Sequence, residues 1–531
     1  MHTISADMLR VMLAGPEEHA LIDLRREGEF AQGHLFFASN VPRAFMELRI
    51  EHLIPRKETP IVIVDRGAYA DDIGEAIGAF GYHNVSVLEG ESAGWERAGG
   101  KLYSGLNVPS KAFGEFVEMT AKTPHIGPED LKKRQDVGEV TVLDSRPLAE
   151  YQVMSIPGAI NCPGAELLYR YSAIRPARDV TIVVNCAGRT RSIIGAQSLI
   201  DAGVSHDVVA LRDGTMGWHL AGLPLDHGQN RFAPAPDASS LSEARAMAAR
   251  HAGRCGVVSL TSEECESLRA REDGRTTYLF DVRDPLEYEA GHLRGAISAP
   301  GGQLIQTFDI FAPVRNARFI LSDDDGVRAP MTAAWLRQTG ISDVCTVSKI
   351  PCPTCDLPRA PRRDKLLNDC PTVALQEAAA LVRDGRPLMD LGSSKDYRRI
   401  HIAGALFSEY HLLPDEAGRH GGSVLITSPD GRVGALAARH LREKGIDAKA
   451  IRGGTAAWIG AGLPTDSGPG NLPERPADVF YRPYDLTAAA ESAMRDYLDW
   501  EKGLLQHVTK EPGIAFARPV LTDLPTSSTI A

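Results

Sequence analysis

The chain has 531 residues, of which 43% are hydrophobic, a net charge of −11 and a pI near 5.8. This length predicts three to five globular domains, and the acidic balance argues against a nucleic-acid partner. No apolar run reaches the roughly 18 residues needed to span a bilayer, which argues against a membrane-spanning protein.

The N-terminal segment and the cysteine content indicate a compartment. Residues 1–7 have neither the basic region nor the apolar region of a signal peptide. Eight cysteines in so long a chain do not make a disulfide framework. We therefore expect a protein of the reducing cytoplasm.

One pattern recurs four times along the chain. Each copy has a short apolar strand that ends in an aspartate, and these are Asp23, Asp144, Asp281 and Asp390. A second apolar strand, a loop, a helix that ends at a glycine and a third strand follow. The glycines are Gly81, Gly203, Gly340 and Gly445, and each is expected to adopt the left-handed conformation that closes a helix. Alternating strands and helices predict a parallel sheet in each copy.

The predicted architecture is α/β, with four tandem modules that are each an open, mostly parallel β-sheet flanked by helices. The modules are assigned to residues 1–105, 106–230, 231–357 and 358–468, with a linker and helical tail at 469–531. Residues 107–122 and 239–252 are expected to form helices between domains. The apolar spacing over 486–508 predicts a tail helix, which we expect to dock on the fourth module rather than on a partner.

The loop of the second copy has the most reactive composition. It spans residues 185–192, after an apolar strand at 180–184 and before a helix at 193–202. Cys186 therefore lies at a strand end above a helix N-terminus. The helix dipole, the loop amides and the nearby Arg189 and Arg191 all favour a thiolate. We interpret Cys186 as a nucleophile for an anionic, sulfur-bearing substrate.

The neighbours of Cys186 are assigned to substrate binding. Arg189 and Arg191 suit a sulfonate or carboxylate, because a guanidinium offers a planar fork of donors. A loop-bracing ion pair is the alternative role, and we give it less weight for Arg189 than for Arg191. Gly188 is expected to allow a tight loop, and Ser192 to cap the following helix. The full set is Ala187, Gly188, Arg189, Thr190, Arg191 and Ser192.

These motifs resemble those of the rhodanese (thiosulfate sulfurtransferase) family. The resemblance lies in Asp144-Ser145-Arg146, the turn at 157–161 and the loop at 186–192, and more closely in Asp281-Val282-Arg283 with the turn at 291–296. It covers about residues 1–468 and is similar to the four-repeat class in which one module keeps the cysteine. It implies a loop that cradles an anion, and ping-pong sulfur transfer through a Cys186 persulfide from thiosulfate or a similar donor to a thiol or cyanide.

The other three loops are predicted to be inactive. Asp65, Asp323 and Ser428 occupy the position of Cys186. A carboxylate repels an anionic substrate and cannot carry a persulfide, and serine lacks a soft sulfur atom. We expect these modules to serve packing. A non-catalytic sulfur carrier, scaffold or sensor built from such modules remains the alternative. A related phosphatase needs Cys-x5-Arg, whereas here the sixth position after Cys186 is Ser192.

Two residues near the loop are assigned to structural support. Asp144 and Arg146 are interpreted as a strand-end ion pair that holds the turn, since all four modules keep the aspartate. In the fourth module Gly392 replaces the arginine. The second module has Met154-Ser155 where the first and third have Gly-His, so its pocket wall differs from theirs.

The remaining cysteines and histidines suggest no cofactor. Cys352 and Cys355 form a single Cys-x-x-Cys pair, whereas a zinc site commonly needs two such pairs. Cys162 is interpreted as a small apolar residue rather than a resolving thiol. The turn histidines are expected to make hydrogen bonds, and they are His34, His292 and His401. We therefore predict no metal and no cofactor. The predicted partners are a small-molecule sulfur donor and a thiol acceptor, with a homo-oligomer left open.

Overall fold

A computed structural model of the chain describes residues 1–67, 73–174, 176, 179–348, 361–486, 489–508 and 511–519. It contains four parallel sheets, one in each predicted module. The α/β fold class predicted from the sequence is therefore confirmed, while the boundaries between modules stay predictions. Cys352 and Cys355 lie outside the described residues.

The four sheets share one strand order. The second strand of each module lies between the fourth and the third, so the order within a module is 1-5-4-2-3. In the first module this is β1 (His2–Ile4), β5 (Val85–Leu88), β4 (Ile61–Asp65), β2 (His19–Asp23) and β3 (Ser39–Asn40). In the second it is β6 (His125–Ile126), β10 (Val208–Leu211), β9 (Thr181–Asn185), β7 (Val140–Asp144) and β8 (Ile160–Asn161).

The third and fourth modules repeat this order. In the third it is β11 (Val258–Leu260), β16 (Val344–Ser348), β15 (Arg318–Asp323), β12 (Thr277–Asp281) and β13 (Ile297–Ser298). In the fourth it is β17 (Thr372–Val373), β22 (Asp447–Ile451), β21 (Ser423–Thr427), β18 (Leu388–Asp390) and β20 (Leu406–Phe407). Every pair within these orders is parallel. In such sheets a ligand binds outside the carboxyl ends of the strands, where the connections diverge.

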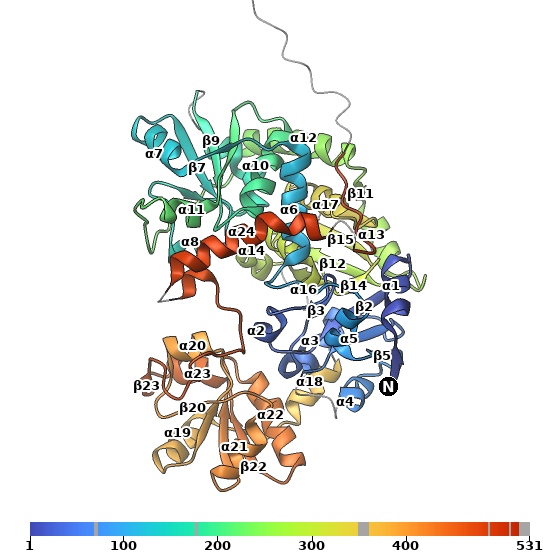
Figure 1. Ribbon diagram of the computed structural model, residues 1–531, viewed down its shortest axis with the longest axis vertical. Coiled ribbons are helices and arrows are strands. Elements are labelled where there is room, and N and C mark those ends of the chain that lie inside the picture. The colour runs from blue at the N-terminus through green and yellow to red at the C-terminus, as the bar shows by residue number, and fades with distance from the viewer. Residues whose placement is uncertain are drawn as a thin grey trace, which may run out of the picture. The chain divides into compact units, whose positions relative to one another are not determined.

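Helices flank each sheet (Figure 1). Those of the first two modules are α1 (Ala6–Ala14), α2 (Glu27–Phe30), α3 (Met46–Leu53), α4 (Ile73–Ala79), α5 (Glu91–Arg97), α7 (Pro128–Asp136), α8 (Leu148–Val153), α9 (Glu166–Ile174), α10 (Thr190–Ala202) and α11 (Gly214–Leu220). Those of the third are α13 (Ser262–Arg269), α14 (Pro285–Ala290), α15 (Gly301–Gln306), α16 (Phe308–Phe311) and α17 (Arg328–Gln338). Those of the fourth are α18 (Pro361–Asn368), α19 (Leu375–Arg383), α20 (Ser394–Arg399), α21 (Leu413–Arg419), α22 (Arg432–Glu443) and α23 (Gly454–Gly460).

The glycines expected after helices do lie there. A glycine follows each of the helices α4, α10, α17 and α22, and these are Gly81, Gly203, Gly340 and Gly445. Their φ angles lie between +81° and +101°. An L side chain is disfavoured at such angles. Local sequence therefore fixes where these four helices end.

The chain forms two compact units. One contains the described residues of Met1–Leu9, His19–Leu106 and Arg359–Tyr481, and hence most of the first and fourth modules. The other contains those of Arg10–Glu18, Asn107–Pro358 and Arg482–Ala531, and hence the second and third modules with the tail.

The second and third modules share an apolar core. Leu167 of α9, Leu199 of α10 and Met331 of α17 belong to one buried cluster, together with Ala248 of α12 (Ala238–Arg254). The helix α6 (Val108–Ala121) packs on α10 and on the third module's α15. The segments predicted as helices at 107–122 and 239–252 are therefore helical, and they lie in the larger unit.

The tail also belongs to this unit. It contains a 3₁₀ turn, η2 (Pro483–Asp485), and the helix α24 (Ala490–Val508), which crosses α6 in Figure 1. The expectation that this helix docks on the fourth module is wrong, because its apolar residues pack on the second. Among the described residues, no helix is long and apolar enough to cross a membrane.

Candidate active site

Cys186 follows β9 at the carboxyl edge of the second sheet, and α10 begins four residues later. Its side chain is buried, with 2% exposed. The Cys186 carbonyl accepts hydrogen bonds from the Thr215 amide (2.8 Å) and the Thr215 hydroxyl (3.0 Å) of α11. The Asn185 amide side chain joins Asp144 (2.9 Å) to the same Thr215 (3.0 Å). Contacts to α11 and to the end of β7 thus fix the start of the loop.

The loops of the third and fourth modules show which way the loop amides point. In the third module, Asp323 Oδ2 accepts from the amides of Val327 (3.1 Å) and Ala329 (2.9 Å). In the fourth, Ser428 Oγ accepts from the Gly434 amide (3.1 Å). The amides four and six residues after the first loop position therefore face the side chain at that position.

The second module presents its thiol at the same position. The residues four and six places after Cys186 are Thr190 and Ser192, and Cys186 Sγ lies 3.6 Å from the Ser192 hydroxyl. Amide donors gathered at a helix N-terminus stabilise an anion. The loop can therefore hold a negatively charged sulfur.

Arg189 is enclosed by carboxylates. Its guanidinium bonds both oxygens of Glu115 (2.7 and 2.9 Å), contacts Glu118 and lies 3.3 Å from Asp213. Burial lowers the pKa of Arg189, but Glu115 and the other two acids outweigh it and raise that pKa. Arg189 therefore braces the loop against α6. From the sequence we expected a loop-bracing ion pair less for Arg189 than for Arg191, and these contacts show that this ranking is wrong.

Arg191 is paired with a single carboxylate of the second module. It forms a bidentate ion pair with Glu150 of α8 (3.1 and 2.8 Å). Burial lowers the pKa of Arg191, whereas Glu150 and then the Cys186 thiolate raise it, and the pKa lies above its ordinary value. Arg191 thus supplies positive charge within electrostatic range of Cys186.

The smaller loop residues act through packing. The backbone of Gly188 is not in the left-handed region. A Cβ added at Gly188 would instead lie 3.0 Å from Met216 Cε and 3.3 Å from Glu501 Oε2. Ser192 does not cap α10, since Arg189 is the N-cap residue and the Ser192 hydroxyl donates to its carbonyl (2.7 Å). Close contact, rather than backbone freedom, explains the glycine.

Ala187 and Thr190 hold the loop to its surroundings. The Ala187 carbonyl accepts from the Met216 amide (3.0 Å). The Thr190 hydroxyl donates to Glu501 Oε1 (2.5 Å). Both residues are buried, so they contribute backbone groups and rigidity to the site.

Asp144 and Arg146 form a buried pair below the loop. The Arg146 guanidinium bonds both Asp144 oxygens (2.8 and 2.6 Å) and the Met154 carbonyl (2.7 Å). The first and third modules repeat this arrangement with Arg25–Asp23 and Arg283–Asp281. In the fourth module the Gly392 amide donates to Asp390 instead (2.7 Å).

The tail supplies residues that sequence reasoning missed. Leu498 and Met494 of α24 pack on Met216, directly beside the loop. Glu501 is 2% exposed and contacts Thr190, and among the described residues its Oε2 has no hydrogen-bond partner. Helical periodicity identifies the apolar face of the tail, but no local signal shows which module that face covers.

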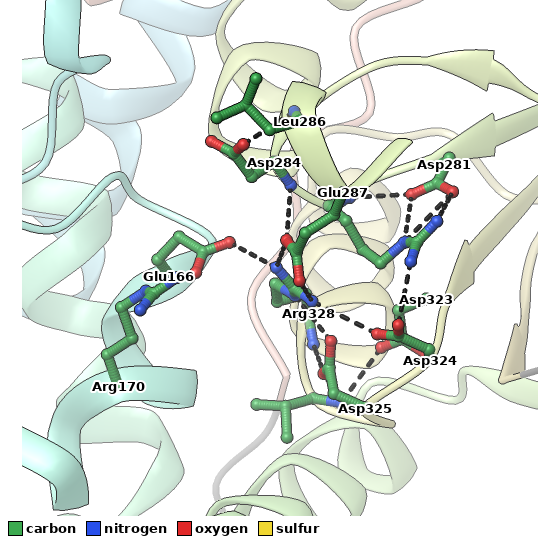
Figure 2. Close-up of polar contacts among 12 residues, drawn as sticks. Glu166, Arg170, Asp281, Asp284, Leu286, Glu287, Asp323, Asp324, Asp325 and Arg328 are labelled. Carbon is green, nitrogen blue, oxygen red and sulfur yellow. Dashed lines mark hydrogen bonds and ion pairs between the residues drawn. The ribbon is translucent and has the colours of Figure 1, made fainter. Parts of the chain in front are cut away.

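The third module's loop has a structural role. Arg328, five residues after Asp323 as Arg191 is after Cys186, is fully buried. Figure 2 shows its guanidinium between Glu287 and Asp325 of its own module and Glu166 of the second. At this loop position the second module has Arg191, paired with Glu150, whereas Arg328 of the third joins two modules.

Cys162 and the turn histidines make structural contacts. Cys162 belongs to the buried core, and burial raises the pKa of its thiol far above the ordinary value. The histidine Nδ1 atoms lie 2.7–3.0 Å from the carbonyl oxygen four residues earlier at His34, His292 and His401. Within the described ranges no group of three or more His, Cys, Asp or Glu side chains is placed to hold a metal.

Comparisons with known proteins identify the family. The rhodanese-like domain matches residues 5–98, 127–221 and 263–349. The crystal structure of thiosulfate sulfurtransferase from Pseudomonas aeruginosa is 39% identical, with a TM-score of 0.89 over 98% of this chain and 100% of that one. An HTH-type transcriptional regulator of Mycobacterium tuberculosis is 42% identical over 99 residues, which span 19% of this chain and 43% of the regulator. The chain therefore belongs to the rhodanese family of sulfurtransferases.

Proposed function

We propose that the chain transfers a sulfane sulfur from thiosulfate, or a similar anionic donor, to a thiol or cyanide through a Cys186 persulfide. The carrying observation is a buried thiol at the loop position where, in the third and fourth modules, loop amides bind Asp323 Oδ2 and Ser428 Oγ. In the first module the sequence places Asp65 at this position. The similarity to a thiosulfate sulfurtransferase over 98% of the chain supports thiosulfate as the donor.

The reaction has two steps. In the first, the Cys186 thiolate attacks the outer sulfur of thiosulfate, a sulfur–sulfur bond forms, and sulfite leaves with the electron pair of the broken bond. In the second, an acceptor thiolate or cyanide attacks the outer sulfur of the persulfide. The products are an acceptor persulfide or thiocyanate, and the Cys186 thiolate is restored without an external oxidant or reductant.

The loop residues have separate parts in this scheme. The amides of Thr190 and Ser192 stabilise the persulfide anion, at roughly 3 kcal/mol for a well-placed donor. Arg191 adds positive charge beside the sulfur. Arg189 holds the loop against Glu115 and so keeps these donors in place. A reducing cytoplasm is the proposed compartment, since it keeps Cys186 as a thiol.

Sulfite release during incubation with thiosulfate and cyanide tests the proposal. The wild-type chain should release sulfite over many turnovers, Cys186→Ala should release none, and Cys162→Ala should keep turnover. Intact mass after donor treatment should show one added sulfur, lost in Cys186→Ala. A persulfide that forms once without further sulfite release would contradict the proposed enzymatic activity and favour the sulfur-carrier alternative.

A further inference from the structure

Both loop arginines are engaged by carboxylates. Arg189 is taken up by Glu115, Glu118 and Asp213, and Arg191 is paired with Glu150. A dianionic donor would therefore need further positive charge near the sulfur. Such charge is present, and it comes from outside the second module's own sheet.

The first additional cation is Lys111 of α6. Its side chain is 5% exposed, and its ammonium lies 4.7 Å from the ring centres of both Tyr497 and Trp500 of α24. Aromatic faces attract a cation but leave its N–H donors unused. Burial lowers the pKa of Lys111 to about 8; Glu501 raises it, and Arg482 and Arg191 lower it. Lys111 is thus within electrostatic range of the loop.

The second additional cation is Arg482, immediately before η2. Its guanidinium lies 3.8 Å from the same Glu150 carboxylate that binds Arg191, and it donates to the Tyr484 hydroxyl (2.9 Å). Because that hydroxyl accepts from Arg482, its own proton is available to an anion. The Arg482 side chain is 49% exposed, so it can meet a ligand that arrives from solvent.

Arg189 with Glu115, Glu118 and Asp213 forms one charge group at the loop. A second group consists of Lys111, Arg191 and Arg482, which face Glu150 and Glu501 through contacts or within electrostatic range. Within this second group three cations face two carboxylates, and such a local excess attracts an anion. Neither the fold of the second module nor its loop would supply it alone.

We propose that Lys111 and Arg482, with the Tyr484 hydroxyl, bind the anionic end of the sulfur donor, so that α6 and the C-terminal segment complete the active site of the second module. The ligand class is a small anion, a sulfonate or carboxylate, that carries a sulfane sulfur. This inference rests on the proposed function for the donor, but the electrostatic part can be tested without turnover.

The experiment compares two alkylating agents of nearly equal size at Cys186, the anionic iodoacetate and the neutral iodoacetamide. In each reaction the thiolate forms a carbon–sulfur bond and iodide leaves. The ratio of the two rates cancels the thiolate fraction and reports the positive charge that an anion meets. Lys111→Met and Arg482→Gln should each lower the iodoacetate-to-iodoacetamide ratio at least roughly threefold, since each removes one charge near the sulfur.

The matched control is Arg495→Gln on the same helix, α24. Arg495 is 56% exposed and pairs with Glu491 at 3.2 Å, so its loss should leave the ratio unchanged. Lys111→Met replaces a buried charge by an apolar side chain of similar length, which favours folding; a circular-dichroism melt checks this.

Turnover provides the second readout. Both variants should raise the KM for thiosulfate roughly tenfold, the usual effect of losing one charge-assisted hydrogen bond. An unchanged ratio and unchanged KM in both variants would overturn the inference. A wild-type chain that releases no sulfite but shows the expected change of ratio would instead refute the proposed function and leave the anion site standing.

Discussion

Thr190, at the first position of α10, donates its hydroxyl proton to Glu501, which lies 311 residues later in the chain. This bond ties the Cys186 loop to α24. Since both side chains are buried, the bond is made away from water. The position of the loop therefore depends on how well α24 is docked.

The docking of α24 can be tested at Leu498. This side chain is 3% exposed and packs with Met494 on Met216. Leu498→Ala should weaken the docking by about 2–4 kcal/mol, the usual cost of such a buried truncation. Hydrogen exchange in α24 should become faster, and thiosulfate turnover should fall. Asp499→Ala, at an 81% exposed neighbour, should change neither; faster exchange in both variants would contradict the packing described here.

The pH dependence of anion binding should follow Lys111, whose pKa burial lowers to about 8. Below that pH the side chain is charged and above it neutral. The facing charges are Glu501 of α24, Arg482 of the tail and Arg191 of α10. The iodoacetate-to-iodoacetamide ratio should thus fall as the pH rises from 7 to 9. In Lys111→Met the ratio should be flat over this range, and an equal fall would exclude Lys111 as the titrating group.

Arg328 should be far more important for stability than an exposed arginine. It bonds Asp325 (2.6 Å), Glu166 (2.8 Å) and Glu287 (2.5 Å), so Arg328→Met leaves buried carboxylates unpaired. We expect a loss of about 3–5 kcal/mol in the free energy of unfolding, measured in urea. The control is Arg269→Met, whose pair with Glu266 is exposed and should be worth less than about 1 kcal/mol.

Arg189 should show its role as a brace in a double-mutant cycle with Glu115. Arg189→Gln removes the cation that lowers the pKa of Glu115, a pKa that burial already raises above its ordinary value. Without Arg189, the buried Glu115 carboxylate destabilises the folded state when it is ionised, and protonation at lower pH relieves this. The stability loss should therefore be smaller at pH 5 than at pH 8. Arg189→Gln/Glu115→Gln should recover part of the loss, and strict additivity of the two changes would contradict the pairing.

Features set by neighbouring residues could be predicted from the sequence. Gly203 ends α10 because its φ of +81° excludes most other residues. Asp144 and Arg146 pair across two positions, and the repeated strand ends locate Cys186. Each of these depends on local geometry that the sequence pattern contains.

Features set by distant contacts could not be predicted. The role of Arg189 follows from Glu115, 74 residues earlier in the chain. The tail's apolar spacing predicts a helix correctly, yet periodicity gives a face and not the surface that it meets. In the sequence Lys111 and Arg482 look like ordinary charged residues, and only the fold brings them within electrostatic range of Arg191.

The docking of α24 on the loop also affects the order in which the chain becomes competent during synthesis. A nascent chain that has released only residues up to the end of the third module contains the reactive thiol but lacks its cover. The anion site proposed above requires residues 482–508, so we expect it to form only after this segment has left the ribosome. Selectivity for anionic reagents at Cys186 should therefore arise later in synthesis than the thiol itself.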